Sequence, residues 1–354
     1  MKDQDFSEDL REQVAQALAN QTPLNICGGN SKRFYAQQIN GETLDVSQHT
    51  GIVNYEPTEL VITVRAGTPL AAIEQQLASE NQMLAFEPPA FADTATMGGT
   101  VACNLSGPRR PFTGAVRDFV LGSRIINGKA EQLHFGGEVM KNVAGYDVSR
   151  LMCGAMGTLG ILLEVSIKVL PRAETEITLV HELTASDSLA RVHQLARQSL
   201  PFSASCFDDH KLHIRLSGTQ GTVQAARKLV GGDLLETGDD FWQRLKEQQL
   251  SFFNNEHDLW RLSLASNVPL MDIPGKTLYE WNGAQRWLIS DETENVIRDR
   301  VSRHGGHASC FRPRQPHAQV FHPLDNGLLT IHRRLKEAYD PQSIFNPARM
   351  YRAI

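Results

Sequence analysis

The spacing of hydrophobic positions predicts alternating helices and strands over the first 170 residues. Leu10 and Val14 fall on one face of a helix, for which Ser7 is the predicted N-cap. Thr68-Pro69 is a favourable start for a second helix. Short apolar runs predict strands at 24–27, 43–46, 59–65, 119–126, 131–135 and 159–170.

Two local signals refine this pattern. Asn127-Gly128 separates two of the strand-like runs and predicts a hairpin with a two-residue turn. Asp147 precedes a short helical stretch and is predicted to be its N-cap.

From residue 175 the sequence pattern changes: predicted strands alternate with predicted helices, and glycine becomes sparse. Strands are expected at 177–183, 202–207, 212–216, 260–264 and 277–281. Helices are expected at 188–199, 222–230, 240–248 and 292–303. This order predicts an α+β domain of the split-βαβ (ferredoxin-like) type, present once or twice. A last helix is expected at 327–339, followed by a turn at 340–347.

Glycine is concentrated in the second half of the first of these two regions. Twelve of the 27 glycines lie between Gly98 and Gly160. Because glycine loses more backbone entropy on folding than other residues, such enrichment indicates a requirement for bare backbone. Amide groups exposed in glycine turns form concavities that bind anions. The pattern predicts a binding surface for a large phosphate-bearing cofactor.

Composition narrows the class of protein. A net charge of −5 and a pI near 6.2, without a run of one sign, argue against nucleic acid as the main partner. The sequence shows no secretory signal and no apolar run long enough for a membrane span, so we expect a cytoplasmic chain. The five cysteines include no CxxC pair, which predicts neither an iron–sulfur cluster nor a zinc site.

The order of the glycine motifs resembles the PCMH-type (vanillyl-alcohol oxidase-like) FAD-binding family, over nearly the whole chain. The resemblance rests on the segments 27–32, 96–102, 106–110, 116–118, 136–147, 154–160, 340–341 and 346–347. The run Gly136-Gly137-Glu138-Val139-Met140-Lys141-Asn142-Val143-Ala144-Gly145-Tyr146-Asp147 is similar to the smaller flavin-type subunit of bacterial three-subunit glycolate oxidases.

The resemblance implies an α+β fold in three parts. A two-subdomain PCMH-type FAD-binding domain is expected at 1–171 and an α+β (ferredoxin-like) cap domain at 172–325. A C-terminal helix and Asn-Pro turn at 326–354 are expected to return to the FAD-binding domain.

The resemblance also assigns cofactor contacts, residue by residue. The first loop would bind the pyrophosphate, the next two segments would lie nearer the ribityl chain and ring, and the last would face the adenine or the flavin edge. The expected cofactor-binding residues are Cys27, Gly28, Gly29, Asn30, Ser31, Lys32, Thr96, Met97, Gly98, Gly99, Thr100, Ser106, Gly107, Arg117, Gly157, Gly160 and Ile161. Because Asn30 follows the glycine pair, the loop offers no His or Cys for covalent attachment, and FAD is expected to be non-covalent.

Reduced flavin carries negative charge, so a nearby cation favours it. Arg109 and Arg110 are the candidate catalytic cations, and Arg117 and Lys141 are further candidates. The alternatives are a structural role for Arg109 and Arg110, a structural ion pair between Arg117 and Asp118, and a solvated Lys141. No metal site is predicted; His304-Gly305-Gly306-His307 is interpreted as a helix C-cap turn rather than a metal or catalytic motif.

The sequence lacks the His-x-Gly-Asp-Gly-x-x-His cap motif of hydroxy-acid oxidising relatives. The resemblance therefore predicts an FAD-binding subunit of a glycolate (2-hydroxy-acid) dehydrogenase that oxidises glycolate to glyoxylate. Its expected partners are a larger FAD-binding subunit and an iron–sulfur subunit that takes the electrons, and these could attach it to the inner membrane. Two alternatives remain open: a self-sufficient flavin oxidase or dehydrogenase, and an assembly subunit with a vestigial FAD site.

Overall fold

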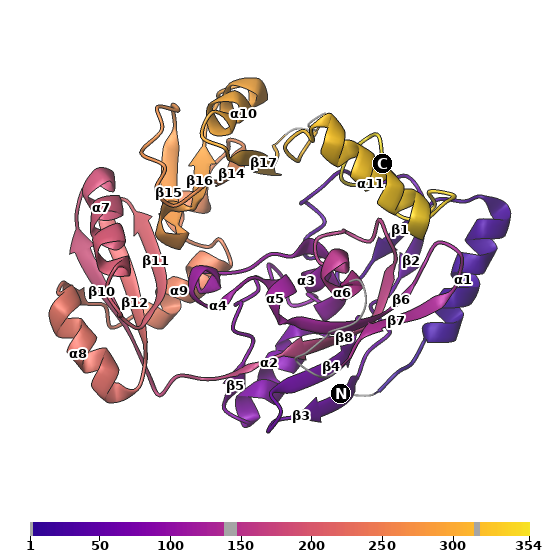
Figure 1. Cartoon of the computed structure of the whole chain (residues 1–354), viewed down its shortest axis with the longest axis horizontal. Helices are drawn as coiled ribbons and strands as arrows, with labels where there is room; N and C mark the ends of the chain where they lie inside the picture. The colour runs from indigo at the N-terminus through magenta and orange to yellow at the C-terminus, as the bar shows by residue number, and fades with distance from the viewer. Residues whose placement is uncertain (1–2, 138–146, 315–318) are drawn as a thin grey trace. The chain divides into compact units, whose positions relative to one another are not determined.

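The computed structural model describes residues 3–137, 147–314 and 319–354, which form two compact units (Figure 1). The first unit comprises residues 1–106, 114–171 and 323–354, and the second comprises 107–113 and 172–322. The boundaries between the units lie after residues 171 and 322, and segment 107–113 belongs to the second unit. The FAD-binding and cap roles expected of the predicted parts stay predictions.

The first unit is built on a five-stranded antiparallel sheet. Its strand order is β3 (Ile52–Glu56), β4 (Val61–Arg65), β8 (Ile161–Lys168), β6 (Val120–Ile126) and β7 (Gln132–Gly136). A separate parallel pair joins β1 (Leu24–Cys27) to β2 (Glu42–Asp45), and β5 (Gln82–Met83) pairs with β9 (Leu170–Pro171). The helices of this unit are α1 (Ser7–Asn20), α2 (Leu70–Ser79), α3 (Met97–Cys103), α5 (Val116–Phe119), α6 (Val148–Met152) and α11 (Asn326–Tyr339).

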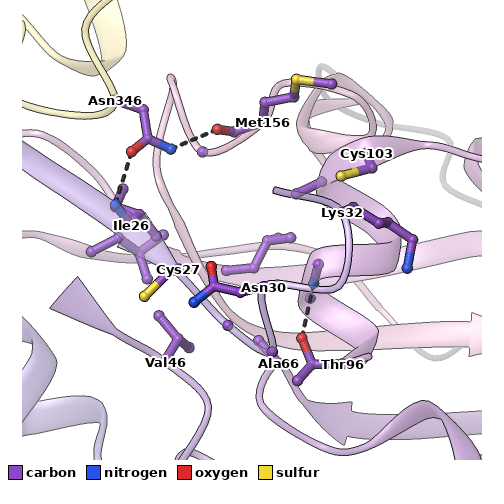
Figure 2. Close-up of a pocket in the computed structure, with 18 of the residues that line it drawn as sticks. Ile26, Cys27, Asn30, Lys32, Val46, Ala66, Thr96, Cys103, Met156 and Asn346 are labelled. Atoms are coloured by element: carbon purple, nitrogen blue, oxygen red, sulfur yellow. Dashed lines mark hydrogen bonds between the residues drawn. The ribbon is translucent and has the colours of Figure 1, made fainter. Parts of the chain in front are cut away.

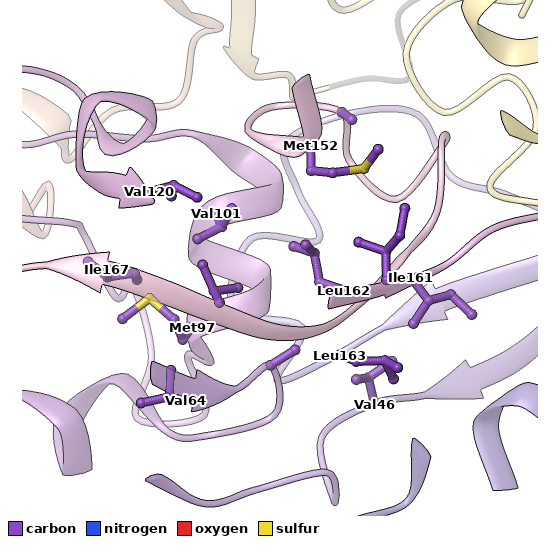
Figure 3. Close-up of a cluster of buried hydrophobic side chains, with 14 of the residues drawn as sticks. Val46, Val64, Met97, Val101, Val120, Met152, Ile161, Leu162, Leu163 and Ile167 are labelled. Carbon is purple, nitrogen blue, oxygen red and sulfur yellow. The ribbon is translucent and has the colours of Figure 1, made fainter. Parts of the chain in front are cut away.

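One part of the hydrophobic core of the first unit lies between the sheet and the short helix α3. Met97 and Val101 of α3 are fully buried beside Val64, Leu163 and Ile167 of the central strands (Figure 3). The alternating pattern of 159–170 therefore identified the central strand β8. No helix was predicted over the glycine segment 96–102, but most of it is helix α3, because Thr96 caps its first turn by accepting a hydrogen bond from the Gly99 amide.

Local predictions in this unit had mixed outcomes. The hairpin β6–β7 is confirmed, but its turn spans five residues, because the Asn127 side chain accepts hydrogen bonds from the Lys129 and Glu131 amides. Asp147 is the N-cap of α6, as predicted. Ser7 is not an N-cap: it is the first residue of α1, and its amide donates to the Asp5 carboxylate.

The second unit is a single eight-stranded sheet made of two similar halves. The strand order is β13 (Asp233–Leu234), β10 (Thr175–Glu182), β12 (Lys211–Gly218), β11 (Phe202–Asp208), β15 (Lys276–Glu280), β16 (Gln285–Ile289), β14 (Leu259–Ser263) and β17 (His307–Arg312). Its helices are α4 (Arg110–Thr113), α7 (Ala185–Ala196), α8 (Gln220–Val230), α9 (Gly238–Lys246) and α10 (Glu294–Ser302), with 3-10 turns η1 (Ser251–Phe253) and η2 (Trp281–Gly283).

The first half has the βαββαβ order of a ferredoxin-like unit, and the second half repeats its strand arrangement. The predicted split-βαβ architecture is therefore present twice, with one helix missing. A loop at 264–275 takes the place of that helix, and the buried Arg286 guanidinium donates to the carbonyls of Pro269 and Val268 within it. The strands β16 and β17 had no sequence prediction.

The two faces of this sheet differ in polarity. The α7, α8 and α10 face is apolar, with Leu179, Ile214 and Leu262 in its cores. The opposite face carries polar side chains in register, among them Thr178, which accepts a hydrogen bond from the Trp242 indole of α9. Polar side chains are seldom buried in such numbers on one face of a sheet, and those that are buried are normally hydrogen-bonded.

Candidate cofactor-binding site

A pocket in the first unit brings together four separate stretches of the chain. It encloses about 910 Å³ including its open mouth and lies between the end of β1, the helix α3, the start of β8 and the C-terminal segment (Figure 2). We call it the glycine-rich pocket. Its lining residues are 26–33, Val46, Ala66, Thr96, Gly98, Gly99, Ala102, Cys103, Met152, 155–157, 160–162, Asn346 and Arg349.

The loop after β1 supplies unsatisfied backbone donors to this pocket. Within the described residues, the amides of Gly28, Gly29, Asn30 and Ser31 donate no hydrogen bond to the protein. Asn30 has a positive φ of 55°. A left-handed residue within such a loop turns successive amide groups toward the same point. Four adjacent free amides suit the oxygens of a diphosphate.

The charged side chains of the pocket reinforce this preference. Lys32, Arg33 and Arg349 line it, and none of the lining residues is an Asp or a Glu. Burial lowers the pKa of Arg349, and the positive charge of Arg33 lowers it further. Positive charge held this way is compensated by an anionic ligand. The donor set of the pocket therefore fits the pyrophosphate of FAD.

The glycines of the pocket are required by close contact between chain segments. A Cβ on Gly29 would lie 1.4 Å from the Thr94 carbonyl oxygen, and one on Gly98 would lie 2.7 Å from the Ala66 methyl group. We expected bare backbone to allow approach of a ligand. At Gly29 and Gly98 the missing side chain instead allows two segments of the protein to pack against each other. The amides of the β1 loop remain available on the pocket side.

The C-terminal segment fastens two walls of the pocket together. Asn346 accepts a hydrogen bond from the Ile26 amide at 2.8 Å and donates to the Met156 carbonyl at 2.7 Å (Figure 2). Behind it, the buried Lys336 ammonium donates to Asp340 and to the carbonyls of Thr158 and Phe345. Residues 343–346 thus tie strand β1 to the turn that precedes β8.

Two cysteines also line the pocket. Burial raises the pKa of Cys27, and the negative charge of Asp45 raises it further; burial likewise raises the pKa of Cys103. Both side chains are therefore thiols at neutral pH, and a thiol is a poor nucleophile. This chemistry is consistent with a cofactor held without a covalent bond.

Most of the predicted cofactor-binding residues line this pocket, and the remainder do not. Those at the pocket are Cys27, Gly28, Gly29, Asn30, Ser31, Lys32, Thr96, Gly98, Gly99, Gly157, Gly160 and Ile161. Met97 and Thr100 belong to the buried side of α3, where a short helix cannot present every residue to one surface. The roles proposed for all of these residues stay predictions.

Three further predicted contacts are used elsewhere. The Ser106 hydroxyl accepts a hydrogen bond from the Val116 amide, and the Gly107 carbonyl accepts one from the Trp281 indole in the second unit. Arg117 is exposed on α5 and does not line the pocket. Lys141 lies outside the described residues.

The candidate catalytic arginines belong to the second unit and do not line the pocket. Arg109 is buried and forms an ion pair with Glu176 at 2.6 Å, with a further hydrogen bond to Ser217. Its environment matches the structural alternative. Arg110 stacks over the Trp281 ring, 4.4 Å from the ring centroid.

Three other residues of the pocket were not among the predicted cofactor-binding residues. Arg33, Arg349 and Asn346 lie at its edge, although only the Asn-Pro turn had been singled out. Arg349 is 316 positions from Arg33 along the chain, so only the fold could bring them together. The segment His304-Gly305-Gly306-His307 follows the end of α10 at Ser302, and Gly305 has the positive φ of a helix C-terminal turn, as the sequence interpretation expected.

Neither a cluster of metal ligands nor a membrane-spanning helix is present in the part of the chain that the structure describes. No three His, Cys, Asp or Glu side chains in the described part of the chain gather as metal ligands would. No helix there combines the length and the apolar character needed to cross a bilayer.

Comparison with known proteins gives the family. Residues 6–136 match the model of an FAD binding domain. Glycolate oxidase subunit GlcE of Escherichia coli is 51% identical over 351 residues, covering 99% of both chains. The chain belongs to the GlcE family. Its members are FAD-dependent oxidoreductase subunits, so the FAD-binding prediction is confirmed at the level of the family.

More distant matches share a part of the sequence or the fold. Glycolate oxidase subunit GlcD of Bacillus subtilis is 32% identical over 157 residues, which are 44% of this chain and 32% of that protein. Alkyldihydroxyacetonephosphate synthase superposes with a TM-score of 0.66 at 16% sequence identity, over 96% of this chain and 74% of that one. The second likeness shows a shared fold, and the predicted α+β PCMH-type fold is confirmed.

Proposed function

We propose that this chain is the FAD-binding GlcE subunit of a glycolate oxidase complex and that the glycine-rich pocket holds its FAD. The observation that supports the site most strongly is the run of four free amides at Gly28–Ser31, facing a pocket whose lining contains cations and no carboxylate. Backbone amides and flexible cations are the groups that proteins use to bind diphosphates.

The residues of the pocket would divide the work of binding. The β1 loop and Lys32 would hold the pyrophosphate, with Arg349 adding charge from the C-terminal segment. Thr96, Gly98 and Gly99 would form the wall along the ribityl chain, and Gly157, Gly160 and Ile161 the opposite wall. FAD itself would supply the two-electron oxidation of glycolate to glyoxylate.

We propose that the electrons then leave through another subunit. None of the five cysteines belongs to a cluster of metal ligands in the described residues, so this chain offers no iron–sulfur relay of its own there. We propose a larger GlcD-type flavin subunit and an iron–sulfur subunit as its partners. Attachment to the inner membrane would come through those partners.

Anaerobic reduction of the flavin tests this proposal. The purified chain loaded with FAD should keep its 450 nm absorbance when glycolate is added alone and lose it when the partner subunits are present. Bleaching by the lone chain would favour a self-sufficient dehydrogenase. Full activity of a complex whose GlcE-type subunit never contains flavin would favour an assembly role with a vestigial site.

Acid precipitation tests the mode of attachment. If FAD is held without a covalent bond, the yellow colour should remain in the supernatant after the protein is precipitated. A coloured pellet that survives washing would contradict the thiol chemistry of Cys27 and Cys103.

A further inference from the structure

Residues 347–354, which we call the C-terminal flap, follow Asn346 and reach the edge of the glycine-rich pocket. Arg349 of the flap lines the pocket and is joined to Gln37 by two hydrogen bonds. The Gln37 amide donates to the Arg349 carbonyl at 3.1 Å, and Arg349 Nη1 donates to the Gln37 carbonyl at 2.9 Å. Because Gln37 lies a few residues after the free amides of the β1 loop, this contact connects the flap to the segment that would hold the diphosphate.

The C-terminal flap is less deeply buried than the residues that precede it. Ile344, Phe345 and Asn346 are at most 3% exposed. The Leu24 amide donates to the Ile344 carbonyl, and the Leu24 carbonyl accepts from the Asn346 amide. In contrast, no residue from 347 to 354 is buried. Because segments with few buried contacts open locally at a lower free-energy cost than the core, the flap can open while the residues before it stay in place.

Backbone strain is concentrated around the start of the C-terminal flap. Ser343, Asn346 and Ala348 have positive φ angles of 52°, 41° and 60°, and residues 340–354 contain no glycine. Left-handed backbone is unfavourable for residues other than glycine, and asparagine tolerates it better than alanine does. Such strain persists only where the surrounding contacts enforce it. Opening the flap would therefore relieve the strain at Ala348.

The charges at the edge of the pocket make the closed flap sensitive to an anion. Burial lowers the pKa of Arg349, and the positive charge of Arg33 lowers it further. Holding this cation in the closed flap therefore costs free energy, and a bound anion offsets that cost. A diphosphate in the pocket would favour the closed flap.

We propose that the C-terminal flap is the gate through which FAD enters and leaves the glycine-rich pocket, with its hinge at Asn346 and the Arg349–Gln37 contact as its closure. The ligand of the gate rests on the proposed function. Ala348 sets how readily the gate opens, because its strained backbone belongs to the closed form while its side chain does not line the pocket.

Stopped-flow measurement of FAD fluorescence with the full chain tests the gate. Association is followed after mixing the flavin-free chain with FAD, and release is followed after dilution of the loaded chain. The variants are Ala348→Gly, which relieves the left-handed strain, and Ala348→Val, which increases it. We expect both rates to fall on the order of 2- to 10-fold in Ala348→Gly and to rise in Ala348→Val. The FAD dissociation constant should stay unchanged, because entry and release pass through the same open form.

Ala130 is the matched control, because it lies in the turn between β6 and β7 with a similar φ of 57° and does not line the pocket. Ala130→Gly relieves the same kind of strain and should leave both FAD rates unchanged. Ala348→Gly keeps the test decisive if the valine variant does not fold.

Three results would each overturn the gate: natural FAD rates in Ala348→Gly, the same change of rates in Ala130→Gly, or an altered dissociation constant at an unchanged association rate. A natural chain that binds no FAD at all would instead contradict the proposed function, and the gate would lose its ligand with it.

Discussion

At the scale of single residues, a buried histidine makes the stability of the second unit depend on pH. His213 lies on the polar face of the second unit's sheet, is 7% exposed, and stacks on Phe241 with ring centroids 3.8 Å apart. Burial lowers the pKa of His213 to about 4 from an ordinary value of 6.5. The folded protein therefore resists protonating this ring, whereas the unfolded chain protonates it readily.

This difference predicts an acid-sensitive second unit. Between pH 6.5 and pH 4 the unfolded chain binds a proton that the folded chain does not, so stability falls as pH falls through that window. His213 should cost about 2 kcal/mol of unfolding free energy between pH 7 and pH 5. Urea titrations at both pH values should show that His213→Phe removes this loss, while the exposed control His304→Phe keeps it. An unchanged pH dependence in His213→Phe would contradict the assignment.

At the scale of elements, Asn346 couples the C-terminal segment to strand β1 and to the turn before β8. Replacing it with alanine leaves the Ile26 amide and the Met156 carbonyl without their partners. Because Asn346 is 3% exposed, water cannot readily take its place. We expect Asn346→Ala to lower the unfolding free energy of the first unit by about 1–3 kcal/mol and to weaken FAD binding. Denaturant titration and FAD titration would measure both, with the exposed Asn40→Ala as control; equal behaviour of the two variants would argue against the clamp.

The elements also show where sequence patterns suffice. Alternation identified β8, and the Asp147 cap identified α6, since both depend on neighbours in the chain. The helix α3 was missed because its first three residues are Met97, Gly98 and Gly99, which have little helical preference without the Thr96 cap and the core beneath. The five-residue turn after β6 was misjudged because Gly128 is needed for contact with Asp340, 212 positions later, rather than for a tight hairpin.

At the scale of the whole molecule, the family resemblance predicted the fold and the cofactor, whereas the environments of individual charged residues could be learned only from the structure. The order of the glycine motifs was enough to predict an FAD-binding PCMH-type fold and GlcE-like function. It could not separate Arg109 from Arg110, because Glu176, the ion-pair partner of Arg109, lies 67 positions along the chain, and Trp281, on which Arg110 stacks, lies 171 positions along it. Nor could it find Arg349, which reaches the lining of the pocket only in the folded chain.

The central claim is that the glycine-rich pocket binds FAD through the amides of the β1 loop. The most direct test compares the FAD content and the FAD dissociation constant of the Gly28→Val variant with those of the control variant Gly221→Val. A Cβ at Gly28 would lie 2.8 Å from the Thr96 hydroxyl oxygen and crowd the loop, whereas a Cβ at Gly221 on α8 would have no neighbour within 4 Å. Arg349→Gln, which leaves the backbone unchanged, covers the case in which Gly28→Val does not fold. The account predicts loss of bound FAD in Gly28→Val, a dissociation constant raised on the order of 10-fold in Arg349→Gln, and natural FAD content in Gly221→Val. Natural FAD affinity in both pocket variants would contradict it.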